Sequence, residues 1–225
     1  NNKNTIAKRL KILKTVVRYS IRMGYDIKNP FDNYTIDCIG GREVALNKEE
    51  YRLFRSVKIS NNSCKSIKLT RDIFIFSCET GLRYSDVMDL KWDHVKLDEK
   101  ILVKSQVKTG KEVFVPLSER AKVLLLIYKK NNKNALNFVF PRIDIQLVNR
   151  YLKIIASNIG IQKKLSSHVA RHTFATLIGS SGKISAFALA NLMGHSDISM
   201  TQKYVNITNS DLQNTMKVIW HEKAI

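Results

Sequence analysis

Apolar residues recur at helical spacing along residues 5–23, near the start of this 225-residue chain. On a helix their side chains would form one stripe, because residues three and four apart lie on the same face. Gly24 and the Asn29-Pro30 pair follow, and both features are typical of a helix end. We therefore predict a helix over 5–23 whose stripe consists of Ile6, Leu10, Leu13, Val17 and Ile21.

The stretch 33–41 lacks this periodicity and ends in two glycines, which predicts a linker. Beyond it, Asn47 can cap a helix whose first turn holds Glu49 and Glu50, where the helix dipole favours carboxylates. Further helical patterns follow, and Gly81 is the expected end of the first of them. The expected helices span 66–80, 121–129, 145–158, 167–179, 186–193 and 210–221.

Between the helices at 66–80 and 121–129, short apolar runs alternate with turn residues. The runs are Val95 with Leu97, then 101–103 and 113–115, and the turn candidates are 98–100 and 109–110. A three-stranded antiparallel sheet fits this pattern. The predicted fold class is mainly α with one small three-stranded antiparallel sheet.

Charge narrows the classes of partner. The chain has 38 Lys and Arg against 19 Asp and Glu, a formal net charge of +19. Such an excess opposes compaction unless a polyanion offsets it, and nucleic acid is the first candidate. An anionic membrane surface is the second. No apolar run approaches the roughly 20 residues that a membrane-spanning helix needs, and residues 1–14 are too polar for a secretory signal.

The three cysteines, Cys38, Cys64 and Cys78, are odd in number and form no CxxC pair. A disulfide framework or a cysteine zinc site is therefore not expected. The simplest location is a reducing cytoplasm.

The predicted helix at 5–23 also carries cations and no acidic residue. They have two interpretations: an ordinary solvated face, or a face that lies against DNA phosphates. The DNA interpretation takes Lys8, Lys11 and Arg18 as contacts. The full set is Lys3, Lys8, Arg9, Lys11, Lys14, Arg18 and Arg22.

His168 and Arg171 share one helix face, because they are three residues apart on the helix at 167–179. His172 lies four residues after His168, a spacing that zinc sites use. Val169 stands where the HExxH zinc pattern has its glutamate, so we expect no metal here. A histidine on a helix is more often structural, and these residues alone leave both interpretations open.

Two further segments carry groups suited to phosphate chemistry. Arg83 follows the helix-ending Gly81 and could meet a phosphate at the start of the next helix, or form a surface ion pair. Lys108 and Lys111 lie beside the turn at 109–110, where a lysine is usually just solvated. Near the chain end, Gly194 and His195 begin a loop and Tyr204 follows in polar surroundings. Taken alone, Tyr204 would be an ordinary half-buried tyrosine.

The order of these groups is more specific than any one of them. The stretches TGLRYSD, VKTGKEVFVPL, SSHVARHTFAT and LMGHSDISMTQKYV resemble the tyrosine recombinase (phage integrase) family, in order and in spacing, over about residues 46–205. Two positions depart from the family pattern: Asp86, where many relatives carry Glu, and Ser167, where Pro is frequent. Neither removes a catalytic group.

The resemblance implies an active site at six positions. Arg83 and Arg171 match the arginines that hold the scissile phosphate, Lys108 matches the hairpin lysine, and Tyr204 matches the nucleophile. The two histidine positions are His168 and His195. We expect Arg83 and Arg171, helped by His195, to neutralise the transition-state charge. We expect His168 to assist deprotonation of Tyr204 and Lys108 to protonate the leaving 5′ oxygen.

The resemblance also implies a domain organisation. Residues 1–35 would be the last helix of a truncated core-binding domain, 36–43 a linker, and 44–225 the catalytic domain. The helix at 210–221 would be amphipathic, with Leu212, Met216 and Ile219 in its stripe. This helix could dock on its own domain or on a neighbouring subunit.

The expected function is site-specific recombination of double-stranded DNA through a 3′-phosphotyrosyl intermediate, without a metal or cofactor. The enzyme would be a tetramer on paired DNA sites and a monomer or weakly associated when free, with accessory DNA-bending proteins as further partners. Lys111 is expected to contact DNA as well. The alternatives are type IB topoisomerase-like relaxation, a non-catalytic DNA-binding module and, more remotely, an RNA-binding protein.

Overall fold

A computed structural model describes residues 2–37, 43–60, 64–130 and 137–205. The chain divides into two compact units, Asn1–Arg42 and Glu43–Ile225. In the described part of the chain, no helix is long and apolar enough to cross a membrane. The predicted helix at 210–221 and most of the predicted linker at 36–43 lie outside the described residues.

The first unit consists of helix α1 (Lys3–Arg22) and the segment that follows it. The side chain of Asn2 caps the helix by accepting a hydrogen bond from the Asn4 backbone N–H at 3.1 Å. Gly24 follows with a φ of +89°, a left-handed conformation that favours glycine. The prediction of this helix is confirmed, with a start two residues earlier than the pattern indicated.

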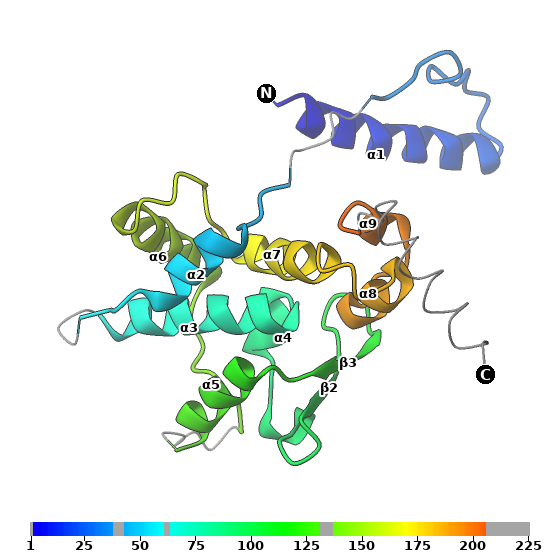
Figure 1. The fold of residues 1–225 in the computed structure, drawn as a ribbon. Coiled ribbons are helices and arrows are strands. Elements are labelled where there is room, and N and C mark those ends of the chain that lie inside the picture. The colour runs from blue at the N-terminus through cyan, green and yellow to red at the C-terminus, as the bar shows by residue number, and fades with distance from the viewer. Residues whose placement is uncertain (1, 38–42, 61–63, 131–136, 206–225) are drawn as a thin grey trace, which may run out of the picture. The chain divides into compact units, whose positions relative to one another are not determined.

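The second unit is built around one central helix, α3 (Lys65–Thr80), as Figure 1 shows. Helices α5 (Glu119–Lys130), α6 (Ile145–Asn158) and α7 (Ser167–Gly179) pack against it. The other helices of the described part are α2 (Lys48–Ser56), α4 (Tyr84–Met88), η1 (Trp92–His94), α8 (Ala186–Met193) and α9 (Ser199–Gln202). Nine described residues of α3 are buried, which explains why its apolar pattern is nearly continuous.

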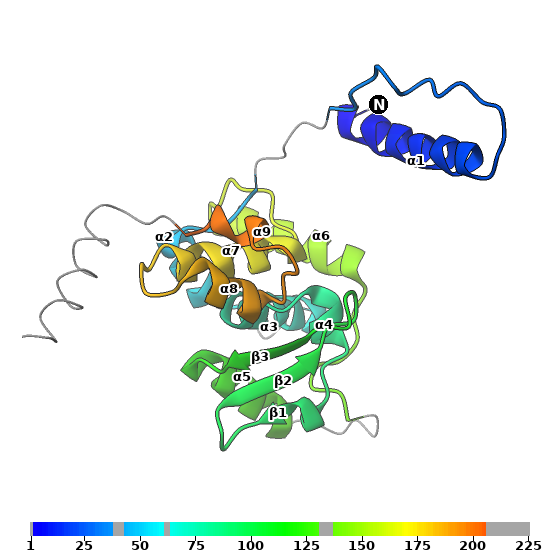
Figure 2. The same ribbon diagram turned by 90° about the vertical axis from the view of Figure 1, so that its right-hand side faces the viewer.

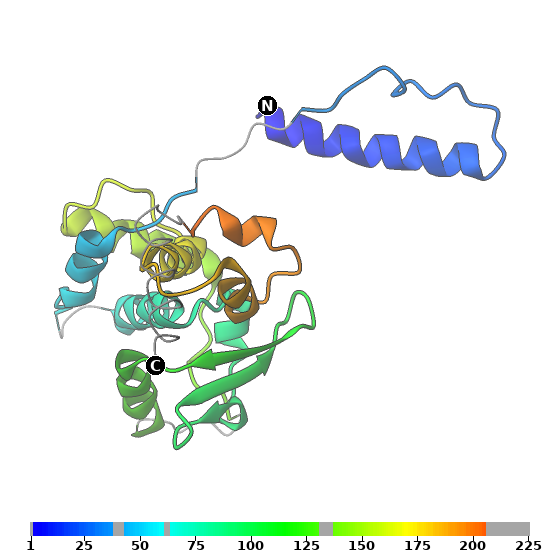
Figure 3. The same ribbon diagram turned by 45° about the vertical axis from the view of Figure 1, so that its right-hand side comes forward.

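The predicted sheet is confirmed. Its strands β1 (Val95–Lys96), β2 (Ile101–Ser105) and β3 (Glu112–Pro116) pair antiparallel in the order β1-β2-β3, side by side in Figure 2. Leu102 pairs with Val115, and both are buried. Side chains alternate between the core and solvent along β3, as a half-buried strand requires. Figure 3 shows the β2–β3 hairpin reaching outward at its loop.

Two buried clusters hold these layers together. One joins α2, α3, α6 and α7, and includes the tilted ring pair Phe54 and Phe74, with centroids 4.6 Å apart. The other joins α3, the sheet and α5, with Phe76 and Phe140 at 5.1 Å. Because α3 contributes to both clusters, its C-terminal end, where Arg83 follows, is fixed from two sides.

The pattern predicts a helix after Arg83 without giving its bounds, and it does not predict the short elements η1 and α9. A helix of four or five residues is too short to show a helical period, and its existence depends on what it packs against.

The capping box at the start of α2 was partly predicted: Asn47 accepts from the Glu50 N–H, and the Glu50 side chain accepts in return from the Asn47 N–H.

Candidate functional site

A glycine turn at the end of α3 places Arg83. Gly81 adopts a φ of +70° and lies so close to the Phe174 ring that a Cβ would come within 2.6 Å of it. The turn brings Arg83 to the N-cap position of α4. From there its Nη1 donates to the side-chain oxygen of Gln106 at 2.5 Å.

Arg171 is buried at the centre of this region, with 3% of its surface exposed. Its Nη1 donates to the Gly81 carbonyl at 2.7 Å and its Nη2 to the Met193 carbonyl at 2.5 Å. Burial and then the charge of Arg83 lower the pKa of Arg171 to about 10, so the guanidinium stays charged at neutral pH. Arg171 therefore joins the ends of α3 and α8 to α7 and keeps a positive charge between them.

His195 follows α8, which ends at Gly194 with a φ of +62°. Its Nδ1 lies 2.7 Å from the Thr201 hydroxyl in α9. Burial, and then the charges of Arg171 and Arg83, lower the pKa of His195 to about 4. Its imidazole is therefore neutral at pH 7 in this structure.

Acid should lower the stability of the protein through His195. The unfolded chain, with a histidine pKa of about 6.5, binds more protons than the folded chain above the folded pKa of about 4. The free energy of unfolding should therefore fall as the pH drops between these values, with this group contributing on the order of 1–3 kcal/mol. Urea unfolding at a series of pH values would show a smaller loss in His195→Gln than in the wild type. Equal losses would mean that the pKa of His195 does not differ between the folded and unfolded chains.

Gln106 connects these groups, and sequence reasoning missed it. Its side-chain oxygen accepts from Arg83 and from the Thr109 hydroxyl, and its Nε2 donates to the Met193 carbonyl at 2.8 Å. Arg83 and Arg171 thus hold the same end of α8, Arg83 through Gln106 and Arg171 directly. The only local signal was the place of Gln106 at the base of the predicted hairpin.

The hairpin that carries Lys108 is anchored at its base. The Val107 N–H donates to the buried Asp86 carboxylate at 2.8 Å, and the Lys111 Nζ donates to the His195 carbonyl at 3.1 Å. Lys108 itself is exposed, and no other described residue forms a hydrogen bond or ion pair with its side chain. The lysine can therefore move over the site while the base of its hairpin stays fixed.

Tyr204 lies at the edge of this region, and its hydroxyl has two partners. It donates to the carboxylate of Glu43, and it lies 2.5 Å from the Nδ1 of His172. Burial, and then the Glu43 carboxylate, raise the pKa of Tyr204 above its ordinary value. The backbone of Tyr204 packs on Gly179 so closely that a Cβ there would come within 2.2 Å of the Tyr204 carbonyl oxygen.

His168 is exposed, one turn before Arg171, and among the described contacts its ring meets that of His172 edge-on at 4.5 Å. Partial burial, and then the charges of His172 and Arg171, lower its pKa. In the sequence, the spacing of His172 from His168 suggests only a zinc partner, and no motif marks Glu43. In the described part of the chain, no group of three or more His, Cys, Asp or Glu side chains could hold a metal ion.

The structure thus joins Arg83, Arg171, His195 and the hairpin base through shared acceptors. Tyr204 and Arg171 are close enough for their charges to interact. Of the predicted DNA contacts, Lys111 lies at this site, whereas Lys8, Lys11 and Arg18 lie on α1 in the other unit.

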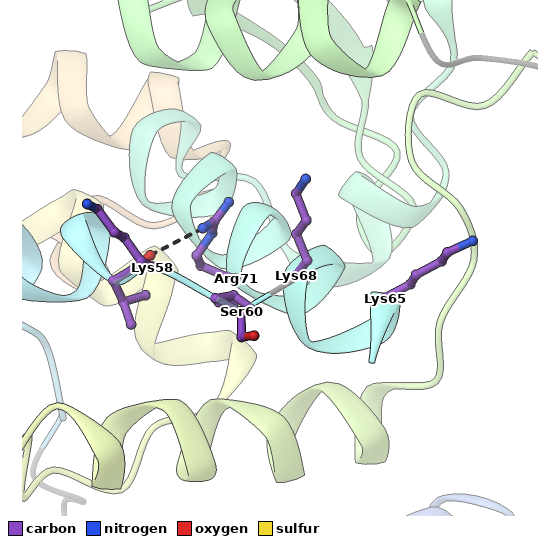
Figure 4. A pocket seen from close by; sticks show the side chains of 7 residues that line it. Lys58, Ser60, Lys65, Lys68 and Arg71 are labelled. Atoms are coloured by element: carbon purple, nitrogen blue, oxygen red, sulfur yellow. Dashed lines mark hydrogen bonds between the residues drawn. The ribbon is translucent and has the colours of Figure 1, made fainter. Parts of the chain in front are cut away.

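A separate cationic pocket lies at the opposite end of α3 from Arg83 (Figure 4). Its volume is about 530 Å³. The guanidinium of Arg71 is fixed there by the Asp72 carboxylate at 2.7 Å and the Val57 carbonyl at 3.2 Å. Its other cations are Lys58, Lys65 and Lys68. Positive charge therefore extends over the second unit beyond the cluster around Arg171.

The chain is similar to the tyrosine recombinase XerA of Saccharolobus solfataricus, with 30% identity over 171 residues, which are 75% of this chain and 57% of that relative. It is also similar to the tyrosine recombinase XerC of Pediococcus pentosaceus, with 27% identity over 240 residues, covering 96% of this chain and 75% of that one. The chain spans little more than half the length of the first two curated relatives that it matches, 57% and 52%.

Solved structures share the fold. The Tn1549 transposon integrase in complex with a circular intermediate DNA matches with a TM-score of 0.75 and 20% identity, over 96% of this chain and 83% of that one. A lambda integrase dimer bound to a COC′ core site matches with a TM-score of 0.68 and 19% identity, over 90% of this chain and 72% of that one. These matches confirm the predicted fold class.

The family model of the phage integrase family matches residues 45–211. That range includes every residue joined around Arg171 as well as Tyr204. Because the match covers most of the chain, the chain belongs to the phage integrase family of tyrosine recombinases.

Proposed function

We propose that this chain cleaves and rejoins double-stranded DNA as the catalytic part of a site-specific recombinase, through a 3′-phosphotyrosyl intermediate at Tyr204. The observation that carries the proposal is the pair Arg83 and Arg171, joined through Gln106 and the Met193 carbonyl, with His195 and Tyr204 within range of the Arg171 charge. The relatives named as tyrosine recombinases, and the neighbours solved with DNA, support it.

The proposed mechanism follows from charge. A phosphodiester carries one negative charge, and attack by Tyr204 adds another on the phosphate oxygens. Arg83 and Arg171 would neutralise it, with His195 as a neutral donor, in a site where partial burial strengthens each contact. The exposed side chain of Lys108 would bring its ammonium group to the leaving 5′ oxygen and protonate it.

The family resemblance predicts that His168 assists the deprotonation of Tyr204. In this structure the Tyr204 hydroxyl contacts His172 and Glu43 instead, and the described contacts include no hydrogen bond between it and His168. The role of His168 therefore remains a prediction. It is supported by the position of His168 on helix α7, one turn before Arg171.

The direct test is incubation with nicked duplexes that carry the ends of candidate mobile elements. Cleavage next to the nick releases a short strand and traps the protein on DNA. We expect an SDS-resistant adduct, and recombinant product from paired sites. Relaxation of plasmid without any recombinant product would favour a topoisomerase-like activity instead.

The partners follow from the same proposal. We expect double-stranded DNA as substrate, a tetramer on paired sites, a monomer or weak association when free, accessory DNA-bending proteins, and a bacterial cytoplasmic location. Residues 1–35 would be the end of a core-binding domain and 44–225 the catalytic domain. The amphipathic residues 210–221 would dock on a neighbouring subunit when sites pair.

The DNA affinity should depend steeply on salt, partly through helix α1. Lys8, Lys11 and Arg18 lie on this helix, and no acidic residue lies in its first turn. Each phosphate neutralised adds about 0.9 to the slope of log affinity against log salt. Replacing the three residues by Ala should therefore flatten the slope by up to about 3 units. Fluorescence anisotropy with a labelled duplex measures it, and an unchanged slope would mean that this face is only solvated.

A further inference from the structure

The Glu43 carboxylate forms a compact network around the Tyr204 hydroxyl. It accepts hydrogen bonds from Tyr204 and from Lys203, and it lies 3.4 Å from the Nδ1 of His172. The hydroxyl has one proton, and it donates this proton to Glu43. In the 2.5 Å contact with His172, the hydrogen must therefore belong to Nδ1, which donates to the phenolic oxygen.

Glu43 is exposed, but the backbone that follows it is anchored to the second unit. Three residues later, the N–H of the fully buried Leu46 donates to the Thr173 hydroxyl of α7 at 2.9 Å. Between them, the Ala45 carbonyl accepts from the Lys163 Nζ at 2.8 Å. The segment is thus fixed along the same helix that carries His172, and the Glu43 side chain has a short reach to Tyr204.

The charges around Glu43 keep it ionised. Partial burial opposes its ionisation, but the hydrogen bonds from Lys203 and Tyr204 outweigh this effect, and the pKa of Glu43 lies below its ordinary value. It is therefore a carboxylate at neutral pH. The ion pair with Lys203 would partly offset its repulsion of an incoming phosphate.

We propose that Glu43, rather than His168, accepts the Tyr204 proton during strand cleavage, with His172 orienting the phenol; this role rests on the proposed recombinase function. As the phenolic oxygen bonds to phosphorus, the bond from phosphorus to the 5′ oxygen breaks. The phenolic proton passes to the Glu43 carboxylate, and the 5′ oxygen takes a proton from Lys108. In rejoining, the 5′ hydroxyl attacks and returns its proton to Lys108, while Glu43 returns its proton to Tyr204.

A carboxylate is basic enough for this step. A free phenol is much less acidic than a carboxylic acid, but the phenolic oxygen loses its hold on the proton as its bond to phosphorus forms. Transfer to a group already hydrogen-bonded to that proton therefore becomes favourable near the transition state. His172, which donates to the same oxygen, leaves a lone pair free for attack and fixes its direction.

The test is Glu43→Gln, which keeps the shape and an acceptor oxygen but cannot take the proton. Single-turnover cleavage of a nicked duplex should be slower by about 10²–10³-fold at neutral pH. The rate of the variant should then rise about tenfold per pH unit, because only the ionised phenol can react without an internal acceptor. The wild type should change little over the same range, since Glu43 is already ionised there.

A matched control is Glu49→Gln, an exposed carboxylate in α2 whose described ion-pair partner is Arg52. It should leave both the rate and the pH profile unchanged. Circular dichroism and DNA affinity of Glu43→Gln establish that this variant folds and binds.

Three results would overturn the proposal, and they are distinguishable. A variant that cleaves as fast as the wild type, or faster, would make Glu43 a restraint on Tyr204 rather than its base. A slow variant that does not recover with pH would reduce Glu43 to a structural contact. If the wild type itself forms no covalent adduct on any element end, the recombinase function fails, and this role fails with it.

Discussion

Tyr204→Phe should abolish the covalent protein–DNA adduct while leaving DNA binding nearly intact. The variant loses only the hydroxyl, whose described partners are Glu43 and His172. Its ring can still pack against the buried cluster of Phe174, Ala175, Leu189 and Met193. Without the phenolic oxygen no bond to phosphorus can form, so the adduct should fall below detection. Denaturing gels of a labelled nicked duplex measure the adduct, and gel shifts measure binding.

Two results would contradict this assignment. An adduct that persists in Tyr204→Phe would mean that another residue is the nucleophile. Strong inhibition of the wild type by EDTA would indicate a metal-dependent nuclease, because the proposed chemistry uses only side chains. Gly179→Ala gives a related check, since its added methyl group would collide with the Tyr204 carbonyl, should displace Tyr204 and should lower the yield of adduct.

Lys108→Ala should slow cleavage of ordinary DNA by about 10²–10⁴-fold, the usual contribution of a general acid. The side chain is exposed on a hairpin whose base is held by Asp86 and His195. Its removal should therefore leave the fold unchanged. With sulfur in place of the bridging 5′ oxygen, the leaving group no longer needs a proton, and cleavage should return close to the wild-type rate. Single-turnover rates on the two substrates measure the rescue.

The control for this experiment is an arginine variant. Arg171→Lys keeps a charge but loses one of the two carbonyl contacts to Gly81 and Met193. This variant should stabilise the charge on the phosphate oxygens less well. A better leaving group does not replace that stabilisation, so the sulfur substrate should not rescue the variant. If Lys108→Ala is not rescued either, Lys108 only binds the DNA backbone. Lys100→Ala, in the other turn of the sheet, should have no effect on either substrate.

Much of the fold could be read from local pattern. The bounds of α6, α7 and α8 agree with the predicted ones, because each helix shows its apolar face over at least two turns and ends at a recognisable residue. Gly81 and Gly194 adopt left-handed conformations where helix ends were expected. The sheet was also predictable, since turn residues separate its short apolar runs.

The site could be predicted only in part. The order of Arg83, Lys108, His168, Arg171, His195 and Tyr204 identified the family, because that order is a property of the chain itself. The contacts that hold these groups depend on residues far apart in the sequence. Gln106 reaches the Met193 carbonyl across 87 residues, and Glu43 reaches Tyr204 across 161.

The sequence by itself determined the longer helices, the sheet and the family of this protein, because helical period, capping residues and turn residues act over a few neighbours. Only the tertiary structure decided which groups meet at the Tyr204 hydroxyl and at the two arginines. The residues around His172 and Glu43 in the sequence do not reveal that these two side chains contact Tyr204. A histidine next to an arginine, or a glutamate at the end of a linker, occurs in many proteins without such a contact. They meet because Leu46 is buried against α7 and Tyr204 packs on Gly179, and such packing depends on the whole core rather than on any one segment.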